Sequence, residues 1–194
     1  SKSNNTSSQY LLENNRGKFT TTVNTLVTNH KSRDLYAIFA DYDNNGYLDL
    51  FILNEKDNRL YQNFGEGEFE PINELGIVHK QNGFLATFVD LDLEGDLDLF
   101  LATDSVNYIY RNNSDGTFND IGEDSGIVGS NSLATDIIYC DFDNDGDVDL
   151  FILNGDGKHE YYNNLRRSNF KNITSTSGLV HSTAGGFAAA GDYN

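Results

Sequence analysis

The chain has 194 residues, which is long enough to bury a core as one domain. Its 30 acidic residues outnumber its 13 basic ones, and the formal net charge of -17 argues against nucleic acid or an anionic membrane as a partner. No apolar run approaches the roughly 20 residues that a membrane-spanning helix needs, so we expect no membrane span.

The first predicted elements are a pair of strands near residues 9–24, a segment that contains "YLLENNRGKF". The same pattern returns as "LYQNFGEGEF", "YIYRNNSDGTF" and "YYNNLRRSNF", and it ends at Phe69, Phe118 and Phe170. In the third of these four copies, Gly116 can adopt the positive φ that a tight hairpin turn favours. A short motif follows three of the copies, as "LGIV", "SGIV" or "SGLV".

An acidic motif recurs in phase with these strand pairs. It reads "DYDNNGYLDL" from Asp41, "DLDLEGDLDL" from Asp90 and "DFDNDGDVDL" from Asp141, and "DYN" at the end of the chain is a shortened fourth copy. Residues 41–49, 90–98 and 141–149 are called the first, second and third acidic loops. Several elements that share one order and a period of about 50 residues indicate a repeat architecture.

The repeat over residues 82–126 illustrates the predicted strands. We expect a first strand at 83–90, a second at 97–102 that is apolar on both faces, a third at 106–113, and a short polar edge strand at 117–123. No segment has a convincing helical period. Four antiparallel strands in each repeat are typical of propeller blades.

The predicted fold is therefore all-β, with about four repeats that form blades of a β-propeller. The small residues Ala37, Ala86 and Ala188 suit first strands packed around a crowded axis, and the last first strand is expected near Phe187. Cys140, in an apolar run, is expected to be buried and inert. The predicted units are the end of a blade at 1–27, blades at 28–78, 79–128 and 129–180, and the start of another blade at 181–194.

The acidic loops have the composition of a cation site. In the third loop, Asp141, Asp143, Asp145 and Asp149 occupy positions 1, 3, 5 and 9, and Gly146 permits a tight turn at position 6. Alternate carboxylates on such a turn can point to one centre, with the position-7 carbonyl facing inward, and hard oxygen ligands in this number suit Ca²⁺. The candidate metal ligands are Asp41, Asp43, Asn45, Tyr47, Asp49, Asp90, Asp92, Glu94, Asp96, Asp98, Asp141, Asp143, Asp145, Asp147, Asp149, Asp192 and Asn194.

About three calcium sites and a partial fourth are thus expected, and other interpretations are weaker. An EF-hand needs a Glu at position 12, where this chain has Ile52, Leu101 and Ile152. Magnesium usually keeps several waters instead of a dense protein cage. Catalytic carboxylates or a solvated acidic turn remain alternatives, although recurrence in every repeat favours a structural role.

These motifs resemble the FG-GAP/VCBS-type repeats of calcium-binding β-propellers, including the integrin α head. The resemblance rests on D-x-D-x-[DN]-G-x-x-D-L, on "YRNNSDGTF" and on "GFAAAGDYN"; the literal Gly-Ala-Pro is missing. It implies a ring that usually has seven blades, so the chain is expected to be part of a larger propeller. It also implies an extracellular, cell-surface or periplasmic module with calcium loops on one face and ligands on the other.

On that resemblance, the ligand face would be formed by the loops that precede each first strand and follow each second strand. These loops are residues 28–34, 79–83, 129–132 and 181–185, together with 55–58, 103–107 and 155–159. The leading hypothesis is a non-enzymatic, calcium-binding module for adhesion or for recognition of a protein or glycan.

Three alternatives remain open, and each has its own signature. A sugar-binding lectin would be supported by pockets that combine an aromatic ring with a carboxamide. The others are a structural unit of a surface layer or filament and an accessory domain of a secreted enzyme. The histidines do not indicate catalysis, since His79 and His181 occupy equivalent repeat positions and no nucleophile motif is present. Unpaired blade edges are expected to associate with another chain or with missing parts of the same propeller.

Overall fold

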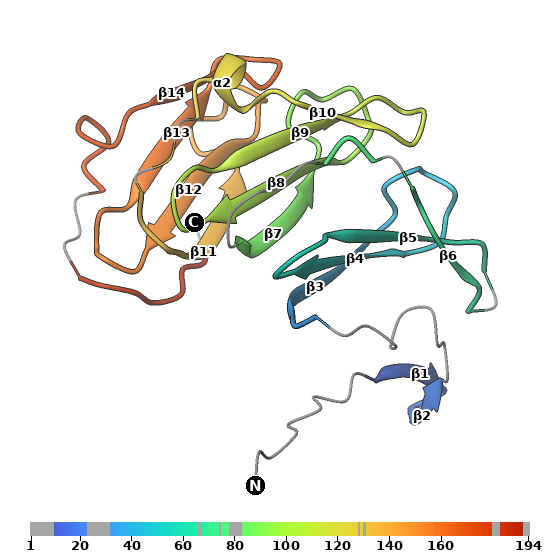
Figure 1. Cartoon of the computed structure of the whole chain (residues 1–194). Coiled ribbons are helices and arrows are strands. Elements are labelled where there is room, and N and C mark those ends of the chain that lie inside the picture. Colours follow the sequence, from blue (N-terminus) through green and yellow to red (C-terminus); the bar gives the residue numbers. More distant parts are fainter. Residues whose placement is uncertain are drawn as a thin grey trace, which may run out of the picture.

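The computed structural model describes residues 10–22, 32–65, 67–73, 75–77, 83–127, 129, 131–179 and 183–191. Within these residues the chain forms three four-stranded antiparallel sheets and a separate two-stranded hairpin (Figure 1). The hairpin pairs β1 (Leu11–Asn15) with β2 (Lys18–Thr22).

Each sheet is one blade, built from four strands in chain order. The first blade comprises β3 (Asp34–Ala40), β4 (Asp49–Asn54), β5 (Arg59–Asn63) and β6 (Phe69–Pro71). The second comprises β7 (Gly83–Val89), β8 (Asp98–Thr103), β9 (Tyr108–Asn112) and β10 (Phe118–Asp120). The third comprises β11 (Ala134–Cys140), β12 (Asp149–Asn154), β13 (Glu160–Asn164) and β14 (Phe170–Asn172).

The three blades have the same register. Ala40 pairs with Asp49, Val89 with Asp98, and Cys140 with Asp149, so each acidic loop joins the first two strands of its blade. At the other end of the first blade, Asp34 pairs with Asn54. The acidic loops therefore occupy one end of the blades, and the loops after the second strands occupy the opposite end.

The core lies between consecutive blades. Every residue of β4 and of β8 is buried, because each of these strands is covered on both faces. At the joint between the first and second blades, the rings of Phe51 and Phe88 meet edge to face with centroids 6.0 Å apart. A second cluster, which includes Phe100 and Leu150, fills the joint between the second and third blades.

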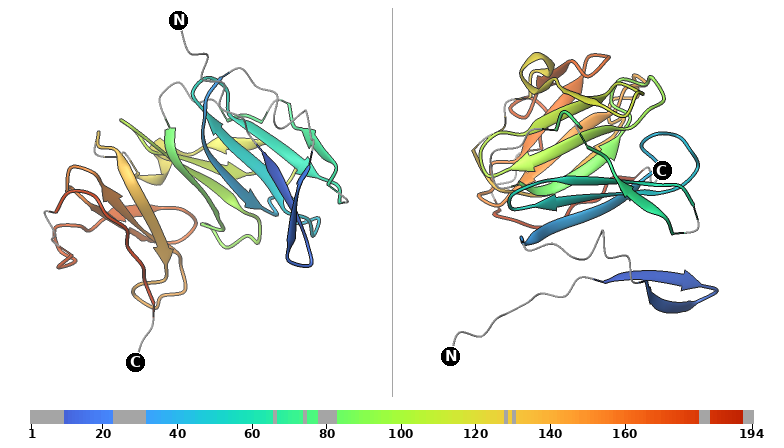
Figure 2. Two further views of the ribbon diagram at one scale, coloured as in Figure 1. Left: turned by 90° about the horizontal axis from the view of Figure 1, so that it is seen from below. Right: turned by 45° about the vertical axis from the view of Figure 1, so that its right-hand side comes forward.

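The blades are arranged like successive blades of a propeller. The first strand of the second blade, β7, contacts the first strands of both neighbours, β3 and β11. Figure 2 shows the three sheets side by side in a row, with the β1–β2 hairpin beyond the first blade. The all-β propeller-blade prediction is confirmed, although the described sheets do not close a ring.

Three local predictions are wrong. The predicted fourth strand at 117–123 ends at Asp120, and a one-turn helix, α2 (Gly122–Ser125), replaces its second half. The chain turns there because the Asp120 side chain accepts a hydrogen bond from the Gly122 N–H, and Ser125 N donates to Ile121 O. No strand forms in the segment 183–191, where Phe187 is 94% exposed.

The third wrong prediction concerns Cys140, which is exposed. Val89 occupies the equivalent position of the second blade and is buried against the third blade. Cys140 lies on a blade face that no described blade covers, so its local apolar pattern did not determine its burial. None of the described helices is long and apolar enough to cross a membrane.

Candidate metal centres

The first position of each acidic loop organises the turn. In the first loop, the Asp41 carboxylate accepts hydrogen bonds from Asn45 N at 2.9 Å and Gly46 N at 3.0 Å. Gly46 has φ +88, a left-handed conformation that favours glycine. The third loop repeats the geometry, since Asp141 accepts from Asp145 N at 3.1 Å and Gly146 N at 3.0 Å. Position 6 of the loop is therefore a glycine because the backbone there adopts a positive φ.

The ninth position ties the loop to the third strand of its blade. Asp49 accepts hydrogen bonds from Tyr42 N at 3.1 Å and from Asn63 N at 2.7 Å. Its equivalents do the same: Asp98 accepts from Leu91 N and Asn112 N, and Asp149 from Phe142 N and Asn164 N. All three carboxylates are buried. Each one is held in place by backbone donors that leave further oxygen lone pairs available.

Three groups of carboxylates converge in these loops. In each group, one oxygen from every member lies within 4.8 Å of the others. The first and third loops use positions 1, 3 and 9, and the second loop uses positions 3, 7 and 9. The groups are Asp41, Asp43 and Asp49; Asp92, Asp96 and Asp98; and Asp141, Asp143 and Asp149.

The other predicted ligands surround these groups. At position 5, Asn45 and Asp145 accept hydrogen bonds from Tyr47 N and Asp147 N, and Glu94 is exposed. At position 1 of the second loop, Asp90 accepts from Gly95 N through one oxygen. The predicted partial fourth site, Asp192 and Asn194, lies outside the described residues.

Burial disfavours the ionised form of the ninth-position carboxylates. It raises the pKa of Asp49 to about 6 and that of Asp98 to about 7, against the opposing effect of their backbone hydrogen bonds. The neighbouring loop aspartates raise both values further. Burial also raises the pKa of Asp149 and of Asp92. A cation at each loop would remove this electrostatic cost.

The donor set fits a hard divalent cation such as Ca²⁺. Each group offers only carboxylate oxygens. Within the described part of the chain, the one ion pair made by an acidic loop joins Arg166 to Asp147 at 3.6 Å, so protein cations do not neutralise the groups. Asp90 Oδ1 is also buried without a hydrogen-bond partner, and a bound ion would supply one.

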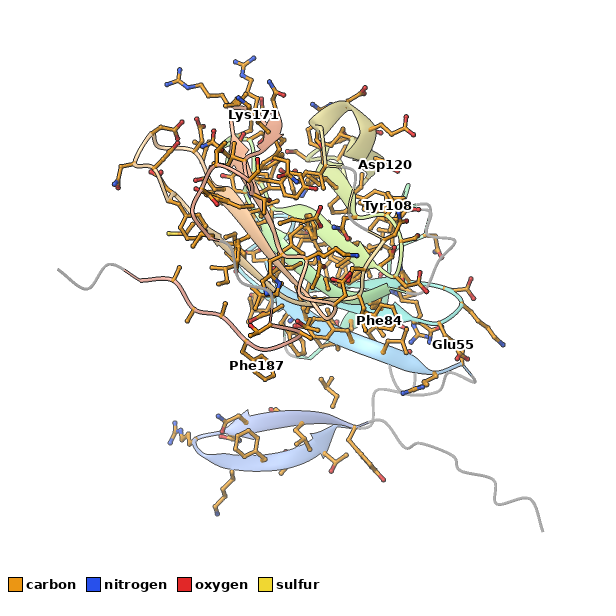
Figure 3. All side chains as sticks on the ribbon, turned by 90° about the vertical axis from the view of Figure 1, so that its left-hand side faces the viewer. Glu55, Phe84, Tyr108, Asp120, Lys171 and Phe187 are labelled. Carbon is orange, nitrogen blue, oxygen red and sulfur yellow. The ribbon has the colours of Figure 1, made fainter. Side chains whose placement is uncertain are left out.

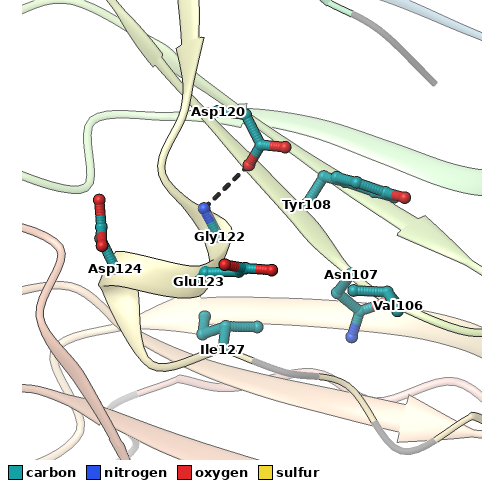
Figure 4. A pocket seen from close by; sticks show the side chains of 8 residues that line it. All are labelled: Val106, Asn107, Tyr108, Asp120, Gly122, Glu123, Asp124 and Ile127. Carbon is teal, nitrogen blue, oxygen red and sulfur yellow. Dashed lines mark hydrogen bonds between the residues drawn. The ribbon is translucent and has the colours of Figure 1, made fainter.

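A second candidate site lies at the opposite end of the second blade. A cavity of about 570 Å³ is bordered by the loop before β9, the end of β10 and the helix α2 (Figure 4). Figure 4 shows Tyr108 and Glu123 projecting into the same space, with the Asp124 side chain on the other side of the helix. The lining residues are Val106, Asn107, Tyr108, Asp120, Gly122, Glu123, Asp124 and Ile127.

The sequence identified this second site only in part. Val106 and Asn107 belong to the predicted ligand-face loop 103–107. Tyr108, Asp120 and Glu123 were missed because they were assigned to strands, and the helical turn α2, which places Glu123 beside the ends of β9 and β10, was not predicted.

These features define a repeat protein of propeller blades with an acidic loop in every blade. Two overlapping segments, residues 41–101 and 90–152, match the model of the FG-GAP-like repeat. Together they span more than half of the chain, which therefore belongs to the FG-GAP-like repeat family.

One solved structure supports the fold. It is a lectin of Agrocybe aegerita that specifically recognises non-reducing terminal N-acetylglucosamine. The match covers 70% of this chain and 37% of the lectin, at 23% sequence identity and a TM-score of 0.50. The chain thus spans little more than a third of that protein, and the likeness shows the fold alone. A search of curated proteins finds no match.

Proposed function

We propose that the chain is a non-enzymatic, calcium-stabilised recognition module that acts outside the cytoplasm, where it binds a protein or glycan for adhesion or recognition. The observation that carries the proposal is the recurrence of a converging carboxylate group at the same end of all three blades. Because the same loop returns in each blade, a structural ion explains it better than a single catalytic centre does.

A bound calcium ion would act on the fold through two connections. It would neutralise carboxylates from the loop between the first and second strands, and the ninth-position Asp would link that ion to the third strand. Extracellular modules commonly bind calcium at ~10⁻⁴–10⁻³ M, a range that matches a calcium-rich environment.

Calorimetry and thermal unfolding test the calcium proposal. The chain, first stripped with EGTA, should take up about three calcium ions, and its Tm should rise as calcium is added because ligands of the folded state stabilise it. Magnesium at the same concentration is the control and should produce a smaller rise. The absence of heat on calcium addition, together with an unchanged Tm in EGTA, would refute the proposal.

A carbohydrate ligand is the second candidate function, and the cavity beside α2 favours it. The cavity combines the Tyr108 ring and the Asn107 carboxamide with the carboxylates of Asp120 and Glu123. An aromatic face can pack against the apolar face of a sugar ring, and the polar groups can hydrogen-bond its hydroxyls.

A glycan array tests this second function, with N-acetylglucosamine-terminated glycans among its members. Binding should be lost in Glu123→Ala and retained in Glu70→Ala, which changes an exposed acid on β6 of the first blade, outside the cavity. Equal binding by both variants would place the ligand elsewhere, and an array without signal would remove the carbohydrate function.

A further inference from the structure

The cavity beside α2 carries three carboxylates that no cation of the described chain neutralises. Asp120, Glu123 and Asp124 border the cavity and are exposed, and none of the ion pairs among the described residues includes them. The described lining residues include no Lys, Arg or His. A ligand that enters this cavity therefore meets negative charge, on a chain whose formal net charge is -17.

This combination of charge and aromatic surface is specific to the second blade. At the position of Tyr108, the other two blades have Arg59 and Glu160, and both of these charged groups already have partners within the chain. The third blade has neutral side chains at the positions of the three acids, namely Asn172, Ser175 and Thr176. The acids and the aromatic ring are thus not required for building a blade.

A buried amide in the cavity lacks a partner. Asn107 is 4% exposed and lines the cavity, and its carboxamide makes no hydrogen bond with the described residues. The equivalent side chains are engaged, since Asn58 Oδ1 accepts a hydrogen bond from the end of β4 at 3.2 Å and His159 Nδ1 accepts one from the end of β12 at 3.0 Å. Figure 4 shows Asn107 across the cavity from Glu123. Because a buried amide normally has hydrogen-bond partners, this one points to a polar ligand.

The acids of the cavity are spread out, which favours an organic cation over a metal ion. Among the described residues, their oxygens do not form a group within 4.8 Å of one another, as those of each acidic loop do. Asp120 accepts a hydrogen bond from Gly122 N at 2.9 Å, and Glu123 and Asp124 leave α2 in different directions (Figure 4). A compact divalent ion needs converging oxygens, whereas an extended ligand can reach separate ones.

Tyr108 supplies the aromatic surface of the cavity. Its ring is nearly parallel to that of Tyr110, with an interplanar angle of 12° and centroids 5.9 Å apart. Tyr108 and Asp120 lie side by side (Figures 3 and 4). An ammonium group at this place would be attracted both by the face of the ring and by the carboxylate.

We infer that the cavity binds a protonated amino sugar, with the sugar ring against Tyr108 and the ammonium group beside Asp120 and Glu123. The inference rests on the carbohydrate function proposed above and adds the charge of the ligand. A Lys or Arg side chain would also be attracted, but it has no acceptor for the amide donors of Asn107. Sugar hydroxyls both donate and accept, so an amino sugar satisfies the carboxylates and the free carboxamide together.

Titration calorimetry with two matched oligosaccharides tests the inference. The probes are a tetramer of glucosamine and a tetramer of N-acetylglucosamine, which share the sugar ring and differ in the charge of the amino group. The measurements are made in calcium, at about pH 6, where the amine is protonated, and in about 0.15 M salt, which screens the net charge of the chain. The glucosamine tetramer should bind roughly tenfold more tightly than the N-acetylated one.

Charge-neutral variants locate the binding in the cavity. Glu123→Gln and Asp120→Asn should each weaken binding of the glucosamine tetramer about fivefold. Asp120→Asn keeps an oxygen that can accept the hydrogen bond from Gly122 N, so α2 should remain in place. Glu70→Gln is the matched control, because it makes the same change in net charge at an exposed acid outside the cavity, and it should bind as the unmodified chain does.

Asn107→Ala tests the free carboxamide. This variant loses no hydrogen bond among the described residues, so its circular dichroism should match that of the unmodified chain. It should weaken binding of both tetramers about threefold, because each loses a hydrogen bond to the amide. Unchanged affinity in the folded variant would contradict the placement of the sugar.

The outcomes separate this inference from the carbohydrate function on which it rests. Equal or tighter binding of the N-acetylated tetramer, with the same sensitivity to Glu123→Gln, would overturn the amino-sugar inference and leave the carbohydrate function standing. Failure of both tetramers to bind would remove both. Tighter binding of a blocked Gly-Lys-Gly peptide would overturn the inference in favour of a protein ligand, and equal losses in Glu123→Gln and Glu70→Gln would reduce it to non-specific attraction by net charge.

Discussion

At the scale of single residues, each ninth-position aspartate has two roles, one in positioning its loop and one in the converging carboxylate group. Asp98 is fully buried, accepts backbone hydrogen bonds from the second loop and from β9, and belongs to a converging carboxylate group. Burial disfavours its ionised form, whereas the fixed N–H donors favour it. The same residue thus positions the loop and provides part of the negative charge that attracts a cation.

The carboxylate groups predict which loop residues matter for calcium. Asp143→Asn should lower the affinity of the third loop at least tenfold, about 1.4 kcal/mol, because it removes a charge from a converging group. Glu94→Gln is the matched control, since Glu94 is exposed and outside the group of the second loop. Calcium titrations monitored by Tm compare the two. A larger loss in Glu94→Gln would show that the ion lies at position 5 and not at the converging group.

At the scale of elements, the joint between blades depends on glycine. Gly126 and Gly178 are equivalent residues with φ +85 and +78, so an alanine at either site incurs a similar left-handed backbone cost of about 1–2 kcal/mol. Only at Gly126 does the added methyl group meet a carbonyl of the next blade.

Gly126→Ala should therefore destabilise the chain more than Gly178→Ala does, by a further ~1–3 kcal/mol from overpacking at the joint. Urea unfolding measures the difference between the two variants. Equal losses would mean that the second and third blades separate without affecting global stability.

At the scale of the whole molecule, stability comes from contacts between neighbouring blades. The two main buried clusters each draw residues from two consecutive blades. Stability in such repeat architectures is approximately a sum of unit and nearest-neighbour terms, and an outer unit has only one neighbour.

This arrangement predicts unequal effects at equivalent positions. Phe100→Ala, at the joint between the second and third blades, should cost about 3–5 kcal/mol because its ring is fully buried. Phe151→Ala, at the same repeat position on the open side of the third blade, should cost less than half as much. Urea unfolding of the two variants checks the ratio, and equal costs would show that the face of the third blade that carries Phe151 is as well covered as the joint at Phe100.

Much of the fold could be predicted from the sequence, because the patterns that indicate its strands and turns involve residues close together in the chain. Alternation and apolar runs predicted the strands, and Asp and Gly at fixed spacing predicted the acidic turns, since both depend on neighbours a few residues apart. The motif order and its period predicted the blades and the FG-GAP-like repeat. The converging carboxylates of all three loops belong to the predicted set.

The tertiary structure alone decided the features that depend on distant residues. Cys140 is exposed, whereas the equivalent Val89 is buried. Asp96 belongs to the second carboxylate group, while Asp41 and Asp141 belong to the other two. The helix α2 forms one wall of the cavity at the opposite end of the second blade. The buried hydrogen bond from Asn112 Nδ2 to the Tyr42 carbonyl, which links the second blade to the first, joins residues 70 positions apart. A repeat pattern cannot distinguish a covered blade from an open one, because burial depends on which neighbour is packed against the sheet and not on the residues within it.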